Sequence, residues 1–458
     1  MIEKNNINNF SSGSNDRHVV IIGNGISGVT CACNLRKYGD FKITIISSES
    51  DHFFSRTALM YIYMGHMKFE HTKPYEDRFW VNNNIHLIKN TVVKVNINEK
   101  SLQFKDDALF NYDALVIATG SRSNQFGWPG QDLKGVQGLY HLSDLEMMEK
   151  NTKNISRAVI VGGGLIGIEM AEMLRSRNID VTFLVREKNF WDSVLPVEEA
   201  TMIARHIREH KIELKAETEL KEVKGDVNGR VSSVITNKGE EIKCEFVALT
   251  VGVSANIDFL KDSGIETDKG VLVNEFFETN VEDIYAIGDC AQHKNPPESR
   301  RPVEQVWYTG KIQGETLAQV LCGKKIPYAP GYWFNSAKFF DIEYQTYGVV
   351  NAQPKENEKV FYWEHSSGKI SLRLVYNSAD GKLLGTNVFG IRLRHEVFDR
   401  WLNEKREVDY IIEHLATANF DPEFYRRHEH QIIEEYNRQT GKCIKTKTRK
   451  GFFASFFK

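Results

Sequence analysis

The sequence predicts an α/β fold built on two parallel-sheet units, followed by a C-terminal α+β region. Two glycine-rich loops, each placed between an apolar strand and a helical stretch, indicate the two units. From residue 331 onward the pattern changes to short strands and then to amphipathic helices, which indicates the third region. The length of 458 residues agrees with roughly three domains.

The first glycine loop, Gly23–Gly28, lies in the context of a dinucleotide-binding turn. It follows an apolar strand at His18–Ile22 and opens a helix that runs to about Lys37, before a second strand at Lys42–Ile46. Glu49 follows that second strand, where a carboxylate accepts hydrogen bonds from a ribose. The alternative is that Glu49 is a solvated loop charge.

Each glycine of this loop has a separate predicted task. Gly23 permits the tight turn, Gly25 lets backbone N–H groups approach a pyrophosphate, and Gly28 lets the helix pack closely on the strand. The helix N-terminus then faces the phosphate charge. Ser27, inside the loop, is assigned to the same nucleotide site.

A second loop repeats the unit with Gly162, Gly164 and Gly167 in the three glycine positions. Its flanking strands are predicted at Ala158–Val161 and Val181–Val185. Two such loops in one chain imply two bound dinucleotides, which is stronger evidence than either loop alone.

Residues on and after the second loop are candidates for binding the second nucleotide. Leu165 and Ile166 begin the helix, and Glu169 is expected in its first turn, where it either faces the nicotinamide or is stabilised by the helix dipole. Arg186 suits the 2′-phosphate of NADPH and Glu187 suits the 2′-hydroxyl of NADH. Both side chains are solvated in the alternative interpretation, so the choice between NADH and NADPH stays open.

Further strand ends supply candidates for the first nucleotide. Ala118-Thr119-Gly120 ends a strand at Ala114–Ile117 in a small-residue turn suited to close approach. Gly288-Asp289 follows another strand and is expected to open a helix, where Asp289 binds sugar-alcohol hydroxyls or merely caps the helix. A helix at about Val306–Leu321 directs its N-terminus, with Trp307, toward a flavin.

The order GNGISG, ATG, GGGLIG, AIGD resembles the pyridine-nucleotide–disulfide-reductase-like flavoproteins. The resemblance implies two nested Rossmann-like domains: an FAD domain at 18–125 and 253–330, and an NAD(P) domain inserted at 126–252. A C-terminal domain at 331–458 is then expected to cover the flavin or to form a dimer interface. Residues 1–17 are expected to be a disordered terminus.

Two segments, 43–59 and Trp333–Ser336 with Gln345 and Gly348, are similar to the ferredoxin-reductase branch, which includes rubredoxin reductases and the flavin subunit of assimilatory nitrite reductase. Arg56 lies between an aromatic residue and a leucine with the spacing of that branch, which implies a place beside the flavin. Glu304 and Val306 resemble a motif whose glutamate contacts the nicotinamide, and we assign Gly252 to the same nucleotide.

The chain departs from that branch at Tyr61, where a lysine usually pairs with the glutamate that corresponds to Glu169. A carboxyl without its lysine in a poorly solvated site is expected to have a raised pKa. We therefore assign Glu169, Arg56 and Tyr61 to the catalytic centre. The chain also lacks the CxxxxC pair of disulfide reductases, which argues against thiol–disulfide exchange.

These features predict an FAD-dependent NAD(P)H oxidoreductase without a redox-active disulfide. It is expected to pass a hydride from NADH or NADPH to N5 of FAD, and electrons onward to a ferredoxin- or rubredoxin-like carrier or a small oxidant. One alternative is a membrane-surface NADH:quinone reductase, anchored by the basic, phenylalanine-rich tail at 442–458. Another is a redox-gated binding protein resembling apoptosis-inducing factor.

Composition and charge restrict the classes of binding partner. The net charge of −2 offers no basis for nucleic-acid binding. The polar N-terminus and the lack of a long apolar run predict a cytoplasmic protein, with peripheral contact at the inner membrane face as the tail's alternative role. We expect a monomer or homodimer and no metal site.

Overall fold

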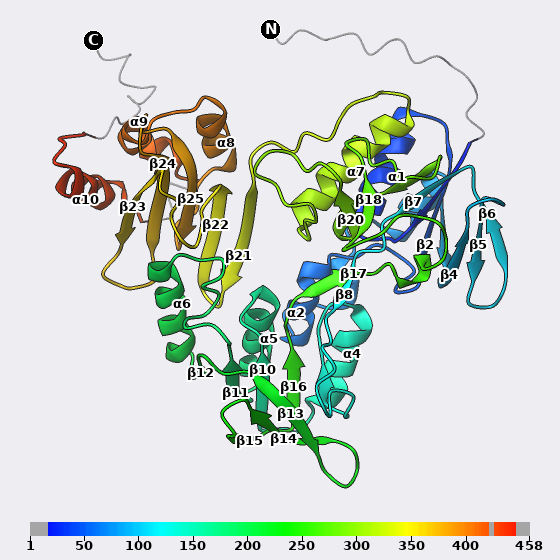
Figure 1. The fold of residues 1–458 in the computed structure, drawn as a ribbon, viewed down its shortest axis with the longest axis horizontal. Helices are drawn as coiled ribbons and strands as arrows, with labels where there is room; N and C mark the ends of the chain where they lie inside the picture. The colour runs from blue at the N-terminus through cyan, green and yellow to red at the C-terminus, as the bar shows by residue number, and fades with distance from the viewer. Residues whose placement is uncertain (1–16, 421–425, 446–458) are drawn as a thin grey trace.

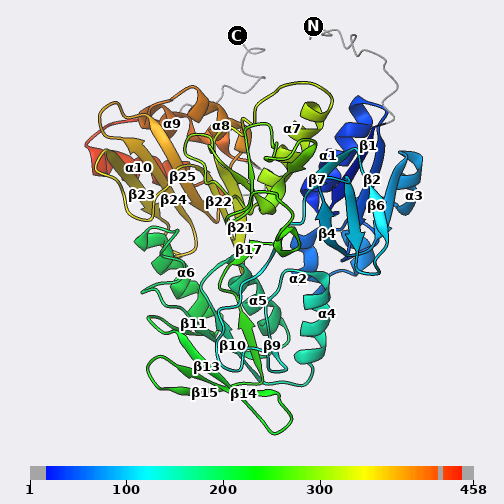
Figure 2. The same cartoon turned by 45° about the vertical axis from the view of Figure 1, so that its right-hand side comes forward.

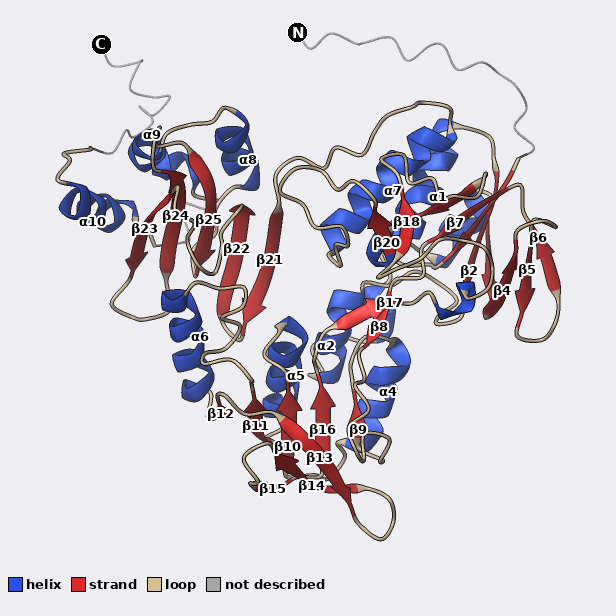
Figure 3. Cartoon of the chain, in the orientation of Figure 1, coloured by secondary structure: helices blue, strands red, loops and turns tan. Residues whose placement is uncertain are grey.

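The computed structural model describes residues 17–420 and 426–445 and contains three five-stranded sheets (Figures 1 and 3). Two are parallel and the third is antiparallel. The predicted α/β class with a C-terminal α+β domain is confirmed, whereas the domain boundaries stay a prediction. Residues 1–16 and the phenylalanine-rich end of the tail, 446–458, lie outside the described residues.

The first sheet carries the first glycine loop at the carboxyl end of its central strand. In spatial order its strands are β19 (Ile284–Ala286), β7 (Ala114–Ile117), β1 (His18–Ile22), β2 (Lys42–Ser47) and β3 (Ile85–Lys89). The central strands are almost wholly buried, as parallel strands covered by helices require. Helices α1 (Ile26–Tyr38) and α7 (Trp307–Leu321) pack together so closely that a Cβ added at Gly314 would lie 2.5 Å from the Ser27 carbonyl oxygen.

The second sheet repeats this arrangement around the second loop. Its strands are β12 (Glu213–Lys215), β11 (Asp180–Leu184), β10 (Arg157–Val161), β16 (Phe246–Leu249) and β9 (Val136–Gln137). Its helices are α4 (Leu142–Asn151), α5 (Leu165–Ser176) and α6 (Val197–Glu209). The chain leaves the first sheet after β7 and returns to it at β19, so the second sheet is inserted in the sequence of the first.

The third sheet is antiparallel and belongs to the C-terminal region. Its strands are β21 (Phe334–Phe339), β22 (Ile342–Gly348), β25 (Leu383–Phe389), β24 (Ser371–Asn377) and β23 (Glu358–Glu364), with helices α8 (His395–Asn403), α9 (Val408–His414) and α10 (Glu429–Thr440). In Figures 1 and 2, α6 lies under the ends of these strands. Glu199 of α6 is fully buried there and accepts hydrogen bonds from Arg373 (3.0 Å) and Asn387 (2.9 Å). The C-terminal sheet therefore docks on the second unit.

Smaller elements complete the fold. They are the antiparallel sheets β4 (Val92–Asn96), β5 (Ser101–Phe104), β6 (Leu109–Asn111) and β13 (Leu220–Gly225), β14 (Val231–Thr236), β15 (Glu241–Lys243); the pairs β8 (Ser121–Ser123) with β17 (Val253–Ala255) and β18 (Val271–Val273) with β20 (Ala291–His293); and helices α2 (Leu59–Tyr63) and α3 (Asp77–Asn82). Within the described ranges, no helix has the length and apolarity that a membrane crossing needs.

One predicted element is wrong. The strand before Asp289 does not open a helix: Gly288–Cys290 forms a single 3₁₀ turn, η4, and the chain continues directly into β20. Gly288 has φ +76°, and a Cβ there would lie 2.4 Å from Ser27 Oγ, so the backbone is held against α1. The Gln313 side chain accepts the Gly288 N–H at 2.6 Å.

Candidate functional site

A cavity of about 610 Å³ lies at the carboxyl end of the first sheet and extends to the first turns of α5. Of the predicted residues, it is lined by Gly23, Gly25, Ser27, Glu49, Arg56, Ala118, Thr119, Gly120, Leu165, Ile166, Glu169, Asp289 and Trp307. The predicted residues outside the lining are Gly28, Tyr61, Gly162, Gly164, Gly167, Arg186, Gly252, Gly288, Glu304 and Val306. Within the described part of the chain, no C-terminal-domain residue lines it, so the expectation that this domain covers the flavin or forms a dimer interface stays a prediction.

The first glycine loop has the geometry that its predicted tasks require. Gly23 has φ +119°, and a Cβ there would lie 2.0 Å from the Ala118 carbonyl oxygen. A Cβ at Gly28 would lie 2.2 Å from the Gly23 carbonyl oxygen, so only glycine lets α1 approach the loop. A Cβ at Gly25 would meet no protein atom within 4 Å. Gly25 is therefore not required by packing, and its side faces open space.

The second loop repeats this division between packed and open glycines. Gly162 has φ +106°, and a Cβ at Gly167 would lie 2.7 Å from the Gly162 carbonyl oxygen and 2.8 Å from the Phe183 ring. A Cβ at Gly164 would meet nothing within 4 Å. The two loops thus present equivalent open positions, Gly25 and Gly164, at the N-termini of α1 and α5.

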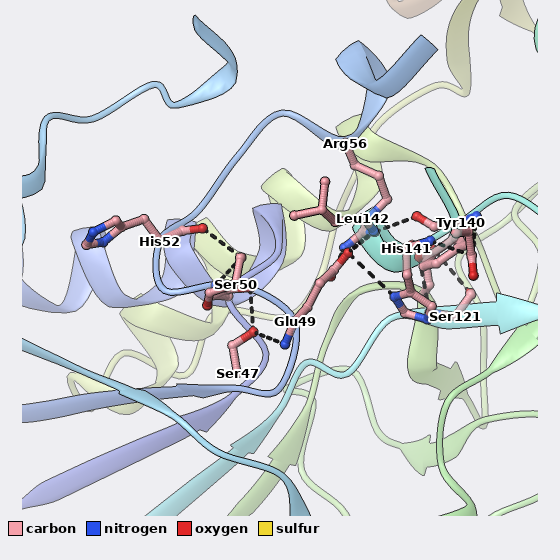
Figure 4. Close-up of polar contacts among 12 residues, drawn as sticks. Ser47, Glu49, Ser50, His52, Arg56, Ser121, Tyr140, His141 and Leu142 are labelled. Carbon is pink, nitrogen blue, oxygen red and sulfur yellow. Dashed lines mark hydrogen bonds and ion pairs between the residues drawn. The ribbon is translucent and has the colours of Figure 1, made fainter. Parts of the chain in front are cut away.

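Glu49 forms a bidentate ion pair with Arg56 in the cavity wall (Figure 4). The Arg56 nitrogens lie 2.9 and 2.6 Å from the two carboxylate oxygens, and the Leu142 backbone N–H donates to one of them at 2.7 Å. Burial alone would raise the pKa of Glu49, but hydrogen bonds from His141 and Arg56 and the Arg56 charge lower it to about 2. Glu49 is therefore an anchored anion and not a solvated loop charge.

Asp289 accepts hydrogen bonds from the hydroxyls of Tyr140 (2.9 Å) and Ser121 (3.1 Å). Loss of contact with water raises the pKa of Asp289 although these hydrogen bonds lower it. Because no helix begins at this residue, the interpretation of Asp289 as a helix N-cap is wrong.

Glu169 lies in the second turn of α5, not in the first as expected, so stabilisation by the helix dipole loses its basis. Burial and repulsion from Glu172 raise the pKa of Glu169 to about 7, against the opposing effect of Lys338. The predicted direction is confirmed. Lys338 of β21 forms an ion pair with Glu172 at 2.8 Å, and its Nζ lies 5.6 Å from the centre of the Tyr61 ring. Tyr61 therefore contacts the neighbouring lysine from outside the cavity.

Two residues assigned to the nicotinamide nucleotide have protein partners. The Glu304 side chain is 4% exposed and forms a bidentate pair with Arg300, with both N–O distances 2.7 Å. Arg186 is 75% exposed and pairs with Glu187 at 3.0 Å. Gly252 has φ +90°, with the Asn124 side chain 3.3 Å from an added Cβ. Val306 is the N-cap residue of α7, next to Trp307 in the cavity.

Sequence reasoning missed several residues of the wall. Tyr140, His141, Gln305 and Phe53 line the cavity, and Arg300 holds Glu304. Tyr140 and His141 follow the short strand β9 of the second unit and reach Asp289 and Glu49 of the first. No local pattern marks them, because only the tertiary fold brings these segments together.

The geometry fits an extended flavin dinucleotide. The open side of Gly25 leaves the loop amides accessible to a pyrophosphate, and the anionic Glu49 and the polar Asp289 lie in the wall that follows. Trp307 at the α7 N-terminus and the start of α5 line the same cavity. Of the residues expected to face NAD(P)H, Leu165, Ile166 and Glu169 line the same cavity as the residues expected to face FAD.

Comparison with known proteins agrees with this arrangement. The nitrite reductase [NAD(P)H] of Bacillus subtilis is 26% identical over 381 residues, covering 82% of this chain and 46% of the relative. The rubredoxin-NAD(+) reductase of Ectopseudomonas oleovorans is 27% identical, covering 69% of this chain and 83% of the relative. This chain thus spans about half the length of the nitrite reductase and most of the rubredoxin reductase.

Solved structures show the same fold. An NAD-dependent persulfide reductase from A. fulgidus has a TM-score of 0.81 at 21% identity, covering 93% of this chain and 84% of that one. A ferredoxin reductase from Rhodopseudomonas palustris has a TM-score of 0.75 at 23% identity, covering 82% and 91%.

The family comparison covers both loops. Residues 17–312 match the pyridine nucleotide-disulphide oxidoreductase family, a span that contains both glycine loops and Asp289. This span is more than half of the chain. The protein therefore belongs to the pyridine nucleotide-disulphide oxidoreductase family, and the predicted class, an oxidoreductase that uses FAD and NAD(P)H, is confirmed at the level of that family.

Proposed function

We propose that this chain takes a hydride from NADH or NADPH onto FAD and passes the electrons to a small carrier protein of the ferredoxin or rubredoxin type. The observation that carries the proposal is the single cavity shared by the first glycine loop, Asp289 and the start of α5. Bound there, the flavin supplies the hydride acceptor, N5, and the route to one-electron carriers. The protein supplies binding, orientation and electrostatics.

Binding of FAD falls to groups on the first unit. The backbone amides around Gly25 and the α1 N-terminus hold the pyrophosphate. Glu49, kept anionic by Arg56, accepts ribose hydroxyls, and Asp289 accepts sugar-alcohol hydroxyls beside Tyr140. The α7 N-terminus at Trp307 favours negative charge at the nearby end of the ring system.

Binding of the nicotinamide falls to the second unit. The amides around Gly164 hold the second pyrophosphate, and Leu165 and Ile166 place the start of α5 against the cavity. Glu169 lies in the same wall, and with a pKa of about 7 it holds or releases a proton near neutral pH. Orientation of the two rings within one cavity is the main contribution to rate.

The direct exit of electrons is supported by the lining residues. Among those described, none is a cysteine, so no thiol lies in position for a disulfide step. The matched relatives include proteins named rubredoxin-NAD(+) reductase and ferredoxin–NAD(+) reductase. Both observations support a carrier protein as acceptor. The cytoplasmic location and the oligomeric state stay predictions.

An anaerobic titration tests this function. FAD-loaded protein is mixed with NADH or NADPH while the flavin absorbance is followed, and is then mixed with oxidised ferredoxin, rubredoxin or a soluble quinone. We expect rapid bleaching by at least one nucleotide and faster reoxidation by an iron–sulfur carrier than by quinone. No bleaching with either nucleotide would refute hydride transfer, and preference for quinone would refute the proposed acceptor class.

A further inference from the structure

Outside the lining of the cavity, two histidines and an aspartate converge between the second unit and the C-terminal sheet. His206 lies in the last turn of α6 and His210 directly follows that helix, whereas Asp341 lies in the turn between β21 and β22. The two Nε2 atoms are 3.2 Å apart. Asp341 Oδ1 lies 2.6 Å from His206 Nε2 and 3.2 Å from His210 Nε2. Three potential ligand atoms thus face one point.

These distances match the edges of a metal polyhedron. Zn²⁺ binds imidazole nitrogen and carboxylate oxygen at ~2.0–2.1 Å, so adjacent ligand atoms of a tetrahedral site are about 3.3 Å apart. Two of the three edges agree with this length, and the third, from His206 to Asp341, is shorter. The Asp341 side chain is 59% exposed, so it has room to move outward by the missing ~0.7 Å.

The surroundings orient both imidazoles. His206 is 1% exposed, and its other ring nitrogen, Nδ1, lies 3.3 Å from a Glu209 carboxylate oxygen. A hydrogen bond of that kind fixes the tautomer and leaves Nε2 to bind a metal. The His210 ring stacks on Phe340 with 4.1 Å between centroids and a 10° angle between planes. Both rings are therefore held with Nε2 facing Asp341.

We propose that His206, His210 and Asp341 form a three-ligand site for a divalent transition-metal ion, Zn²⁺ in the first instance. Two imidazole nitrogens and one carboxylate oxygen suit this class of ion better than Mg²⁺ or Ca²⁺. The ion would join α6 to the β21–β22 turn and so fix the C-terminal sheet on the second unit. No metal site was expected from the sequence, and the third ligand lies 131 residues beyond His210.

The site is structural. Glu209, the acidic residue beside the histidines, contacts His206 and lies 3.6 Å from the Lys369 ammonium group, so it does not serve as a free base. Lys369 also lies 3.4 Å from Asp341 Oδ2, and its positive charge opposes the ion. Removing that charge is therefore expected to tighten binding of the ion.

Zinc uptake by the tag-free, FAD-loaded protein tests the proposal. After treatment with a chelator, the chain is titrated with Zn²⁺ in competition with a chromophoric chelator, and bound metal is counted after gel filtration. We expect one Zn²⁺ per chain and a higher melting temperature. His210→Gln and Asp341→Asn, both at partly exposed positions, are expected to weaken binding by at least ~100-fold, more than the loss of an outer partner does. Lys369→Met is expected to strengthen it.

The matched control is His430→Gln. His430 is exposed on α10 and lies 3.3 Å from Glu434, so it also pairs with a carboxylate, but among the described residues it belongs to no group of three potential metal ligands. Its variant is expected to bind zinc as the wild type does. Equal uptake by wild type, His210→Gln and Asp341→Asn would overturn the proposal, as would less than one ion per wild-type chain at excess zinc. Neither outcome depends on reduction of the flavin.

Discussion

Replacing Gly25 by alanine separates the binding of FAD from the stability of the fold. The residue has φ −74° and ψ −178°, an extended conformation open to alanine, and an added Cβ meets no protein atom within 4 Å. Loss of a glycine stabilises a fold by ~0.4–1 kcal/mol through the unfolded chain, whereas alanine is a poorer helix N-cap by a similar amount. We therefore expect the free energy of unfolding of the apoprotein to change by less than ~1 kcal/mol.

Binding of FAD is expected to respond quite differently. If the pyrophosphate lies against Gly25, the new methyl group occupies its space, and overpacking of one methyl costs ~1–3 kcal/mol. That cost corresponds to an affinity loss of about 5- to 150-fold. Titration of apoprotein with FAD, followed by quenching of flavin fluorescence, measures the dissociation constant, and urea denaturation measures the stability.

Two further glycines serve as controls. Gly28→Ala places a Cβ 2.2 Å from the Gly23 carbonyl oxygen, so it is expected to lower stability and FAD affinity together. Gly164→Ala, at the open position of the second loop, is expected to spare FAD and weaken NAD(P)H. If Gly25→Ala bound FAD as tightly as the wild type, the phosphates would lie elsewhere, and the assignment of the first loop would be refuted.

Three other substitutions test the charged groups around the site. Because the pKa of Glu169 is raised from 4.5 to about 7, its stabilising contribution is present below pH 4.5 and is lost as the pH rises through 7. The free energy of unfolding of the Glu169→Gln apoprotein is therefore expected to exceed that of the wild type by roughly 1–3 kcal/mol at pH 8 and by little at pH 4.5. A difference between the two proteins that is the same at both pH values would contradict this. Arg300→Met leaves the buried Glu304 carboxylate unpaired and is expected to cost ~3–5 kcal/mol in urea denaturation. The double variant Arg300→Met/Glu304→Gln is expected to recover most of that loss, and failure to recover would mean that the charge is not its cause. Arg186→Ala is expected to weaken the binding of NADPH by about tenfold and to leave that of NADH unchanged in binding titrations, since only NADPH carries a 2′-phosphate for that exposed guanidinium. Equal NADPH affinities of the variant and the wild type would mean that Arg186 is a solvated residue.

The parts of the fold that the sequence predicts well are those set by local chemistry. The predicted strands at His18–Ile22 and Ala114–Ile117 agree with β1 and β7 to the residue, because apolar runs end at glycines or turn residues. The tasks of Gly23 and Gly28 follow from spacing alone, and the close approaches at both positions agree with them. The geometry of a loop that depends on its own glycines can therefore be predicted from the sequence alone.

The failures share the opposite cause. The turn at Gly288–Cys290 was expected to open a helix, yet its conformation depends on Ser27 and Gln313, which belong to other elements. The hydroxyl of Tyr140 reaches Asp289 from the second unit. Two of these three contacts, Gly288 with Ser27 and Tyr140 with Asp289, join residues more than a hundred positions apart. Sequence periodicity therefore cannot predict them.

The surroundings of Glu169 include one feature that the sequence predicts and one that it does not. The absence of a lysine at position 61 correctly predicts a raised pKa. The sequence does not reveal that a cation comes instead from the third sheet, where Lys338 pairs with Glu172 and lowers the pKa of Glu169 from outside the cavity. Because Lys338 lies on β21, three residues before Asp341, the position of the C-terminal sheet sets the charge felt by a carboxyl in the cavity wall. The C-terminal domain thus acts on the site through electrostatics, although none of its described residues lines the cavity. Any contact that fixes β21 against α5 and α6 therefore also fixes the pKa of Glu169.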